Sequence, residues 1–282
     1  FVRSADDLNL IKNELNKRNV NIPVIAKIEK PEAIENLNEI INAFDGILVA
    51  RGDLGVEMPL KELPILQKKI VNECLQNRKP VIIATQMLDT MIQNPTPTRA
   101  EVNDIANAIY DGADAVMLSG ETAIGDYPVE SVQIMADIAQ SVEKDFDRQN
   151  FNRYILNESM HYKDGRGSIC HAAMTISNDL SINTIVIMTE SGVTAMKMAQ
   201  HRPKARIFAL CPNYKVCCKL ALIWGVTPLL VNPTTSTDKM IIDSGELLKE
   251  RKIIKKGDSF IITAGVSVGV TGSTNMLKIH KV

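Results

Sequence analysis

The sequence has almost no net charge, no long apolar run and few cysteines, and each of these gaps excludes a class of protein. Its 32 basic and 33 acidic residues give a formal net charge of −1, which offers no basic surface for nucleic acid or an anionic membrane. No apolar run is long enough to cross a bilayer. The five cysteines are odd in number and lack CxxC spacing, which fits a reducing cytosol better than a disulfide framework. We therefore expect a cytoplasmic protein that binds neither nucleic acid nor membrane.

Histidine clusters and chain-start signals are also missing. The four histidines are scattered along the chain without metal-ligand spacing. The sequence begins at Phe1, with neither an initiator Met nor a signal peptide, and this indicates a piece of a longer protein. What is present is enough for a sizeable core, because 45% of the 282 residues are hydrophobic and 23% are charged. This length predicts two domains.

The stretch 22–29, Ile-Pro-Val-Ile-Ala-Lys-Ile-Glu, predicts a short buried strand that ends in two opposite charges. Because side chains alternate along a strand, Lys27 and Glu29 point to the same side. This pair is either a surface salt bridge that contributes little to stability or part of a functional site.

A second charged strand end favours the functional site. The apolar run 46–50 leads directly into Arg51-Gly52-Asp53. Asp53 could join Glu29 in binding a divalent cation, because hard cations such as Mg²⁺ take carboxylate oxygens and keep several waters. Gly52 lets the backbone approach a ligand, and exposed amides there could hold the oxygens of an anion.

Strand-then-helix units repeat along the chain and predict an α/β fold with parallel sheets. The first set has strands at 22–28, 46–50, 80–85 and 114–119, with a helix stripe at 34–44 and a capping box at Thr98 and Glu101. Every candidate residue there lies at the C-terminal end of a strand, as in (β/α)₈ barrels. Only four complete units are present, so this part of a barrel cannot close and leaves two open sheet edges.

A polar stretch, about 145–164, predicts a linker, and we place the domain boundary between 147 and 148. Beyond it, strands are expected at 184–188, 206–210, 226–231 and 259–263, and a helix at 237–251. The last run, 276–282, is expected to return as an antiparallel edge strand. Residues 1–147 and 148–282 are therefore predicted to form separate α/β domains.

Four motifs in order resemble those of the pyruvate kinase family. Residues 22–34, centred on Lys27-Ile28-Glu29, are similar to its active-site signature, and 50–53, 84–88 and 118–122 are similar to its later strand ends. The resemblance covers nearly the whole chain. It implies the C-terminal half of a pyruvate kinase, that is, the second half of the catalytic (β/α)₈ barrel followed by a regulatory α/β domain with a mostly parallel sheet.

The resemblance implies transfer of a phosphoryl group between phosphoenolpyruvate and ADP, which gives pyruvate and ATP in glycolysis. Lys27 would neutralise the transferring phosphoryl oxygens. Glu29 and Asp53 would hold Mg²⁺ or Mn²⁺. The K⁺ ligands, a substrate arginine and most nucleotide contacts would lie in the absent half, and the family assembles as a homotetramer.

The remaining site residues follow from the same resemblance. The amides of Gly52 and Asp53 would grip the substrate carboxylate at the start of a short helix. Thr85 would add a hydroxyl contact and stand on the proton path, with Ser119 as a weaker candidate for the same relay. Arg51 would brace the loop or a subunit contact. Without the resemblance, Thr85 is an ordinary strand-end turn residue.

The second domain carries a candidate phosphate cradle where a strand turns into a helix, so that free amides and hydroxyls meet the positive end of the helix dipole. A Gly-rich loop at 265–275 could close over it. In the family this place binds activators. The expected effector contacts are Thr189, Ser191, Gly192, Thr194, Gly272 and Ser273.

The expected ligand class depends on Glu190, which stands where sugar-bisphosphate-responsive animal members carry Lys. A carboxylate repels a phosphate, so fructose bisphosphate is disfavoured and a sugar monophosphate, AMP or no ligand is expected. The alternative is an ordinary strand-to-helix turn with a good N-cap.

Three functions remain open from the sequence. The first is the pyruvate kinase half, whose isolated 282-residue chain is expected to be inactive. The second is a Mg²⁺-dependent aldolase or lyase of the pyruvate-handling barrels, which also place carboxylates at strand ends. The third is an effector-binding and assembly module without catalysis. A coupled assay for ADP-dependent pyruvate formation separates them.

Overall fold

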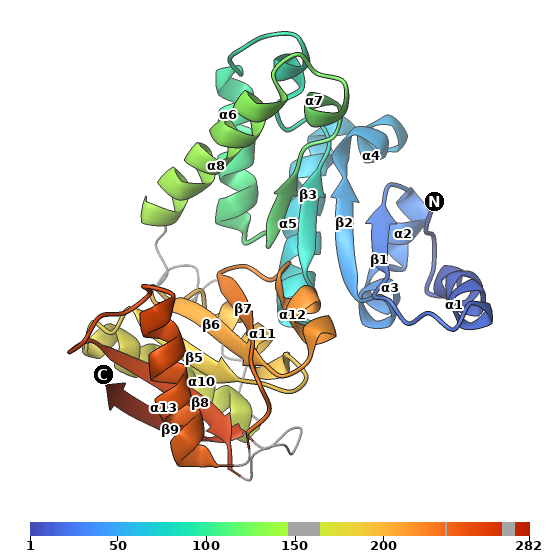
Figure 1. Ribbon diagram of the computed structural model, residues 1–282. Coiled ribbons are helices and arrows are strands. Elements are labelled where there is room, and N and C mark those ends of the chain that lie inside the picture. Colours follow the sequence, from blue (N-terminus) through green and yellow to red (C-terminus); the bar gives the residue numbers. More distant parts are fainter. Residues whose placement is uncertain (146–163, 235, 267–273) are drawn as a thin grey trace. The chain divides into compact units, whose positions relative to one another are not determined.

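The chain divides into two compact units, Phe1–Asp147 and Arg148–Val282, which are described separately (Figure 1). The computed structural model describes residues 1–145, 164–234, 236–266 and 274–282. Most of the predicted linker therefore lies outside the described residues. Within the described part of the chain, no helix has both the length and the apolar character that a bilayer crossing requires.

The first unit alternates strands and helices, as the sequence predicts. Its elements are α1 (Asp7–Lys17), β1 (Ile25–Ile28), α2 (Pro31–Glu35), α3 (Leu37–Ala43), β2 (Gly46–Ala50), α4 (Arg51–Glu57), the 3₁₀ helix η1 (Leu60–Glu62), α5 (Leu63–Gln76), β3 (Val81–Ala84), the 3₁₀ helix η2 (Asp89–Ile92), α6 (Arg99–Asp111), β4 (Ala115–Met117), α7 (Gly120–Ala123) and α8 (Pro128–Asp145).

Its four strands form one parallel sheet in the order β1-β2-β3-β4 (Figure 1). The register places Ile28, Val49 and Ile83 side by side, and all three are buried. The neighbouring row contains Lys27 and Leu48, which point to the opposite face and keep exposed surface. Successive right-handed crossovers bring the helices to one face of such a sheet. The other face therefore keeps solvent access among the described residues, as expected for a partial barrel.

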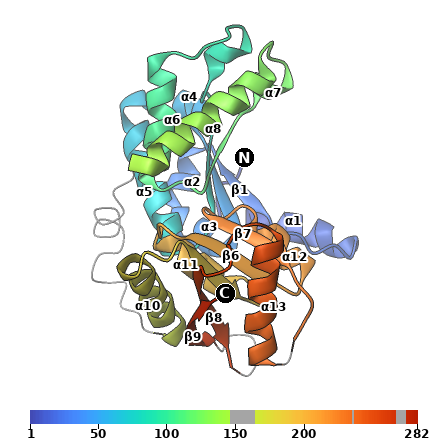
Figure 2. The ribbon, with the colours of Figure 1, turned by 60° about the vertical axis from the view of Figure 1, so that its left-hand side comes forward.

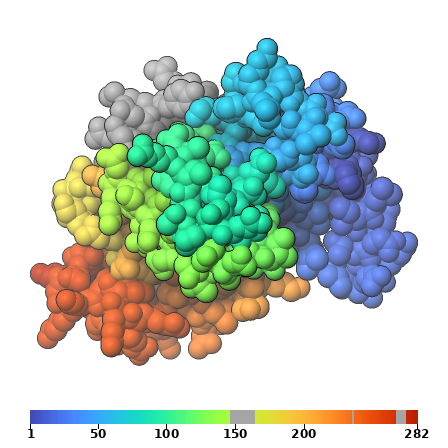
Figure 3. Space-filling view, turned by 90° about the horizontal axis from the view of Figure 1, so that it is seen from above, coloured from blue at the N-terminus to red at the C-terminus, as the bar shows by residue number. Residues whose placement is uncertain are grey.

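The helix boundaries of this unit follow local sequence signals. Thr98 caps α6 by accepting a hydrogen bond from the Glu101 amide, while the Glu101 carboxylate accepts one from the Thr98 amide. Gly112 ends α6 in the left-handed conformation, with φ of 102°. Helices α6 and α8 pack against each other, and they lie side by side at the surface, teal and light green in Figure 3.

Three details of this unit differ from the expectations. The helix stripe at 34–44 is split into α2 and α3, because the helix is interrupted at Asn36, whose side-chain amide donates to the carbonyl of Arg3. The strand expected from residue 22 begins only at Ile25, where pairing with β2 starts. It is also only half buried: β1 is an edge strand, and Ile25 and Lys27 lie on the face that the helices do not cover.

The second unit has its own sheet, and strand positions agree with the sequence pattern to within a few residues. Its elements are α10 (Gly165–Asp179), β5 (Thr184–Met188), α11 (Val193–Gln200), β6 (Arg206–Cys211), α12 (Tyr214–Leu220), β7 (Val226–Leu230), α13 (Thr237–Glu250), β8 (Ser259–Gly265) and β9 (Thr274–Lys281).

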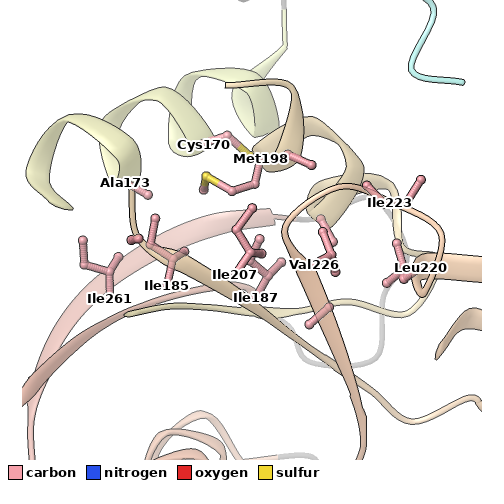
Figure 4. Close-up of a cluster of buried hydrophobic side chains, with 14 of the residues drawn as sticks. Cys170, Ala173, Ile185, Ile187, Met198, Ile207, Leu220, Ile223, Val226 and Ile261 are labelled. Atoms are coloured by element: carbon pink, nitrogen blue, oxygen red, sulfur yellow. The ribbon is translucent and has the colours of Figure 1, made fainter. Parts of the chain in front are cut away.

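This sheet has the order β7-β6-β5-β8-β9, parallel except for β9, which pairs antiparallel with β8 as predicted. Helices cover both faces. One face packs against α10, α11 and α12 through residues such as Ile185, Met198 and Leu220 (Figure 4). The other face packs against α13 through Phe208 and Met240, and Figure 2 shows α10 and α13 on opposite sides of the sheet. The second unit is a three-layer α/β domain.

Candidate active site

Lys27 forms ion pairs with two carboxylates at neighbouring strand ends. Its Nζ lies 2.5 Å from Glu29 Oε2 and 2.8 Å from Asp53 Oδ2. Glu29 follows β1 directly, and Asp53 stands in the first turn of α4, which begins where β2 ends. The side chains differ in environment, since Glu29 is 6% exposed and Asp53 is 53% exposed. The shared parity of Lys27 and Glu29 along the strand thus brings them together.

These contacts shift the pKa values of the pair. The hydrogen bond from Lys27 lowers the pKa of Glu29 against the opposing effect of burial. The hydrogen bond to Asp53, and then the one to Glu29, raise the pKa of Lys27 above its ordinary value. Lys27 therefore stands as a single side-chain cation between two carboxylates.

The two carboxylates fit a divalent metal. Both contact the same ammonium group, so they converge on one point that already attracts positive charge. Carboxylate oxygens are the ligands that Mg²⁺ and Mn²⁺ prefer. Among the described residues, no group of three or more His, Cys, Asp or Glu side chains is arranged for a metal. Mg²⁺ typically uses one or two carboxylates and completes its shell with water and substrate oxygens, which agrees with two protein ligands.

Thr85 and Gly52 meet beside this cluster. The Thr85 hydroxyl accepts a hydrogen bond of 2.7 Å from the Gly52 amide and donates one of 2.6 Å to the Ala84 carbonyl. Thr85 has φ of 71°, a left-handed conformation that is rare for a β-branched residue. In this state the Gly52 amide, expected to contact a substrate carboxylate, has the Thr85 hydroxyl as its partner.

Arg51 connects the Thr85 segment to helices α5 and α6. Its guanidinium donates 2.9 Å to the Thr85 carbonyl and lies 2.5 Å from Asp104 Oδ2 of α6. It also contacts Gln67 of α5 at 3.5 Å and the Met87 sulfur at 2.8 Å. The side chain is only 11% exposed.

Glu121 is a site residue that the sequence reasoning missed. It is 3% exposed and accepts hydrogen bonds from the amides of Leu88 and Ser119, at 3.1 and 2.7 Å. It therefore joins the segment after β3 to the segment after β4. Its signal was present, because a carboxylate stands two residues after Ser119 where a helix begins. No hydrogen bond between the described residues links the Ser119 and Thr85 side chains.

The expected phosphate cradle lies between β5 and α11. The Thr189 hydroxyl accepts a hydrogen bond of 2.9 Å from the Gly192 amide, and the Thr194 hydroxyl lies 2.8 Å from that of Thr274. Both threonines are buried, whereas Ser191 and Glu190 are exposed. Gly272 and Ser273, also expected as effector contacts, lie outside the described residues.

This turn occupies a special place in the sheet. The chain leaves β5 toward β6 and β7, whereas β8, on the other side of β5, is reached from the opposite face through α13. The strand order therefore reverses between β5 and β8. In open α/β sheets ligands bind beyond the carboxyl ends of the strands at such a point.

Comparison with known proteins identifies the family. The description "Pyruvate kinase, barrel domain" matches residues 1–132, and "Pyruvate kinase, alpha/beta domain" matches residues 167–280. The chain belongs to the pyruvate kinase family. The predicted fold class, part of a (β/α)₈ barrel followed by a separate α/β domain, is confirmed.

Individual relatives match along the whole chain. A pyruvate kinase from Clostridium acetobutylicum is 43% identical over 100% of this chain and 59% of its own length. One from Geobacillus stearothermophilus is 46% identical over 99% of this chain and 48% of its own. The crystal structure of a pyruvate kinase from Cryptosporidium parvum superimposes with a TM-score of 0.91 at 33% identity, covering 100% of this chain and 57% of that chain. The chain thus spans about half the length of the curated relatives it matches.

Proposed function

We propose that the strand ends of the first unit form part of a pyruvate kinase active site. The whole protein would transfer a phosphoryl group from the enol oxygen of phosphoenolpyruvate to a terminal phosphate oxygen of ADP. The resulting enolate would then take up a proton at its methylene carbon to give pyruvate. The observation that carries the proposal is the ammonium of Lys27 between the carboxylates of Glu29 and Asp53, at strand ends that belong to this family.

Lys27 would serve the phosphoryl transfer itself. Charge on the phosphoryl oxygens must be neutralised while the group moves, and positioning and charge stabilisation dominate this reaction. The Lys27 side chain is 49% exposed, so it can turn from Asp53 toward a substrate phosphate without unpacking the core. Its raised pKa keeps it charged at neutral pH.

Glu29 and Asp53 would hold the Mg²⁺ or Mn²⁺. When bound, the metal supplies charge neutralisation at the phosphate and enolate oxygens. Glu29 would serve as the fixed ligand, because it is buried and its lowered pKa keeps it ionised. Asp53 is the more exposed ligand and must exchange its contact with Lys27 for the metal.

Gly52, Asp53 and Thr85 would bind the substrate carboxylate. The first-turn amides of α4 have no partners within the helix and favour an anion. A bound carboxylate would take the Gly52 amide from the Thr85 hydroxyl, which is then available to the substrate and to the proton path. Ser119 is a second candidate for that path. Arg51 would brace this segment, as its contact with the Thr85 carbonyl supports.

The second unit would bind a regulatory phosphate in the turn between β5 and α11. Its position at the reversal of strand order supports this, as do the free amides at the start of α11. A sugar monophosphate or AMP is favoured because Glu190 is exposed beside the turn. From family membership we further propose a cytoplasmic homotetramer that also needs K⁺.

A coupled assay tests the proposed function on the whole protein that contains this chain. Pyruvate formation that requires both phosphoenolpyruvate and ADP is expected. Cleavage or synthesis of a carbon–carbon bond next to pyruvate, without ADP, would instead support the aldolase or lyase. Binding of phosphate ligands with neither reaction would support the effector-binding and assembly module.

A further inference from the structure

A series of polar contacts connects helices α5 and α6 to the candidate active site. We call Arg51, Gln67, Asp104 and Asp111 the Arg51 network. Asp104 lies 2.5 Å from the Arg51 guanidinium, and Gln67 contacts Arg51 at 3.5 Å through its oxygen. The Gln67 amide nitrogen donates 3.0 Å to Asp111 Oδ2, at the end of α6. The network thus joins α5 and α6 to the first residue of α4.

The network ends on a strained segment. Arg51 donates to the carbonyl of Thr85, and both Thr85 and Gln86 have positive φ, 71° and 53°. Such conformations persist where the surrounding structure holds them, and they are costly for a β-branched residue. Thr85 is held at two points, its carbonyl by Arg51 and its hydroxyl by the Gly52 amide. The Arg51 contact supports the left-handed backbone of Thr85, and the hydrogen bond from the Gly52 amide depends on that backbone conformation.

We propose that Asp104 and Gln67 are positioning residues that orient Arg51, so that it keeps Thr85 left-handed and its hydroxyl on the Gly52 amide. Their importance for catalysis rests on the proposed function, in which Thr85 and the Gly52 amide contact substrate. Their effect on the Thr85 backbone does not.

The physical basis is the buried guanidinium. An arginine has five donors in a rigid plane, so fixing one edge of the plane aims the other. The charged contact with Asp104 is the strongest available anchor, because hydrogen bonds between ionised groups exceed neutral ones. Gln67 is 6% exposed and cannot turn to water, so its bond to Asp111 fixes which atom faces Arg51.

Hydrogen exchange at the Gly52 amide measures this effect directly. Gly52 is in the first turn of α4, where amides have no partner within the helix, and its one recorded hydrogen bond among the described residues goes to Thr85. In the 282-residue chain, Asp104→Ala should speed Gly52 exchange by about tenfold, the factor for a lost hydrogen bond of ordinary net strength. Arg51→Lys should act similarly, because lysine lacks the second arm of the fork.

Two references keep the test specific. The Met58 amide, bonded to Leu54 at the end of the same helix, should keep its exchange rate. Asp137→Ala on α8 removes an exposed aspartate that accepts a hydrogen bond from Gln133, and it should change neither amide. Thr85→Val should match Asp104→Ala at Gly52. Unchanged Gly52 exchange in Asp104→Ala, or equal acceleration of Met58, would overturn the inference.

A second measurement separates this inference from the proposed function. Titration of the same variants with phosphoenolpyruvate and Mn²⁺ reports whether the Thr85 segment contacts substrate. Faster Gly52 exchange with weaker phosphoenolpyruvate binding supports both proposals. Faster exchange with unchanged binding supports the positioning role of Asp104 and rejects the substrate contacts of Thr85 and Gly52.

Discussion

Glu29 and Asp53 contact the same ammonium group, yet their surroundings assign them different tasks. Glu29 is nearly buried and accepts a charged hydrogen bond from Lys27, which lowers its pKa. Asp53 stands in the exposed first turn of α4. A buried carboxylate is costly to leave unpaired, whereas an exposed one can exchange partners cheaply. Asp53 is therefore the position at which a substitution should change affinity for the proposed metal without unfolding the site.

We predict that Asp53→Asn weakens Mn²⁺ binding by roughly tenfold or more, because the amide oxygen keeps the shape but removes a full negative charge. Electron paramagnetic resonance counts free Mn²⁺ directly. The far-UV circular dichroism should not change, since the side chain is half exposed. Wild-type Mn²⁺ affinity in this variant would remove Asp53 from the metal site.

Lys27→Met is the matched comparison, since it removes the opposite charge from the same cluster. It should preserve or strengthen Mn²⁺ binding, because the competing ammonium is gone. In the active protein, phosphoryl transfer should lose about 3 kcal/mol of transition-state stabilisation, typical of a deleted charge-stabilising group. Turnover close to that of the wild type in this variant would show that Lys27 is not needed for phosphoryl transfer.

His201, which follows α11 in the second unit, predicts a pH effect on stability. Burial, and then the neighbouring His171, lower its pKa to about 4, below the ordinary value of 6.5. Between these values the unfolded chain binds the proton more readily, so stability falls as the pH falls from 6.5 toward 4. At about 1.4 kcal/mol per pKa unit, roughly 2 kcal/mol should be lost by pH 5.

Fluorescence of Trp224, the one tryptophan of the chain, follows urea unfolding of the second unit. His201→Gln should have a smaller loss of stability between pH 7 and pH 5 than the wild type. His280→Gln, which alters a partly exposed histidine on β9, should keep the wild-type slope. Equal slopes in all three proteins would show that other groups control the acid sensitivity.

At the scale of elements, the features that depend on neighbouring residues could be predicted from the sequence. The features that depend on contacts between distant residues could not. The capping box of α6 and the left-handed end at Gly112 were readable because each depends on residues within one turn. The break at Asn36 was not, because its partner is the Arg3 carbonyl, 33 residues away. The left-handed conformation of Thr85 could not be predicted either, because β-branched residues rarely adopt it. Its carbonyl accepts a hydrogen bond from Arg51, which lies 34 residues away in the sequence.

The same limit applies to the candidate site. Lys27, Glu29 and Asp53 could be grouped from strand parity and from the rule that parallel strands end at one edge. Asp104 and Gln67 could not, because they lie on helices α6 and α5, far from Arg51 in the sequence, and contact it only once those helices have packed. The strand-end motif predicts which residues meet a ligand. The residues that aim them depend on helix packing, which the motif does not encode.

The turn between β5 and α11 carries its own prediction. Two of its three hydroxyls already have partners, Thr189 with the Gly192 amide and Thr194 with Thr274, so a phosphate must displace these bonds and should bind modestly. Glu190→Lys replaces repulsion by attraction and should raise affinity for fructose 1,6-bisphosphate more than for ribose 5-phosphate or AMP. Calorimetric titration of the 282-residue chain measures all three.

Glu246→Lys is the matched control, because it makes the same charge change on α13, which packs on the opposite face of this sheet. It should leave all three affinities unchanged. Tight fructose 1,6-bisphosphate binding by the unmodified chain would contradict the argument from Glu190. Absence of binding by any ligand, in either protein, would mean that the turn serves only to cap α11.

At the scale of the whole molecule, the two units differ in how completely they enclose their sheets. The second unit has helices on both faces and an antiparallel strand beside β8. The first unit has four strands, and in the described residues β1 and β4 each pair on one side only. Its open face carries Leu48 and Ile82 beside Lys27, all with exposed surface. The candidate active site thus stands at the edge of an incompletely covered sheet.

We therefore predict that a purified polypeptide of these 282 residues binds Mn²⁺ but forms no pyruvate from phosphoenolpyruvate and ADP. Phosphoryl transfer needs substrates held in line in a water-excluded site, and an open sheet face cannot exclude water. The unpaired edges of β1 and β4 should also make the polypeptide associate as its concentration rises, which light scattering detects. The pyruvate kinase of Geobacillus stearothermophilus, assayed in parallel, is the positive control. ADP-dependent pyruvate formation by a contaminant-free sample, abolished by Lys27→Met, would contradict this prediction. It would show that the part of the barrel in this chain suffices for catalysis.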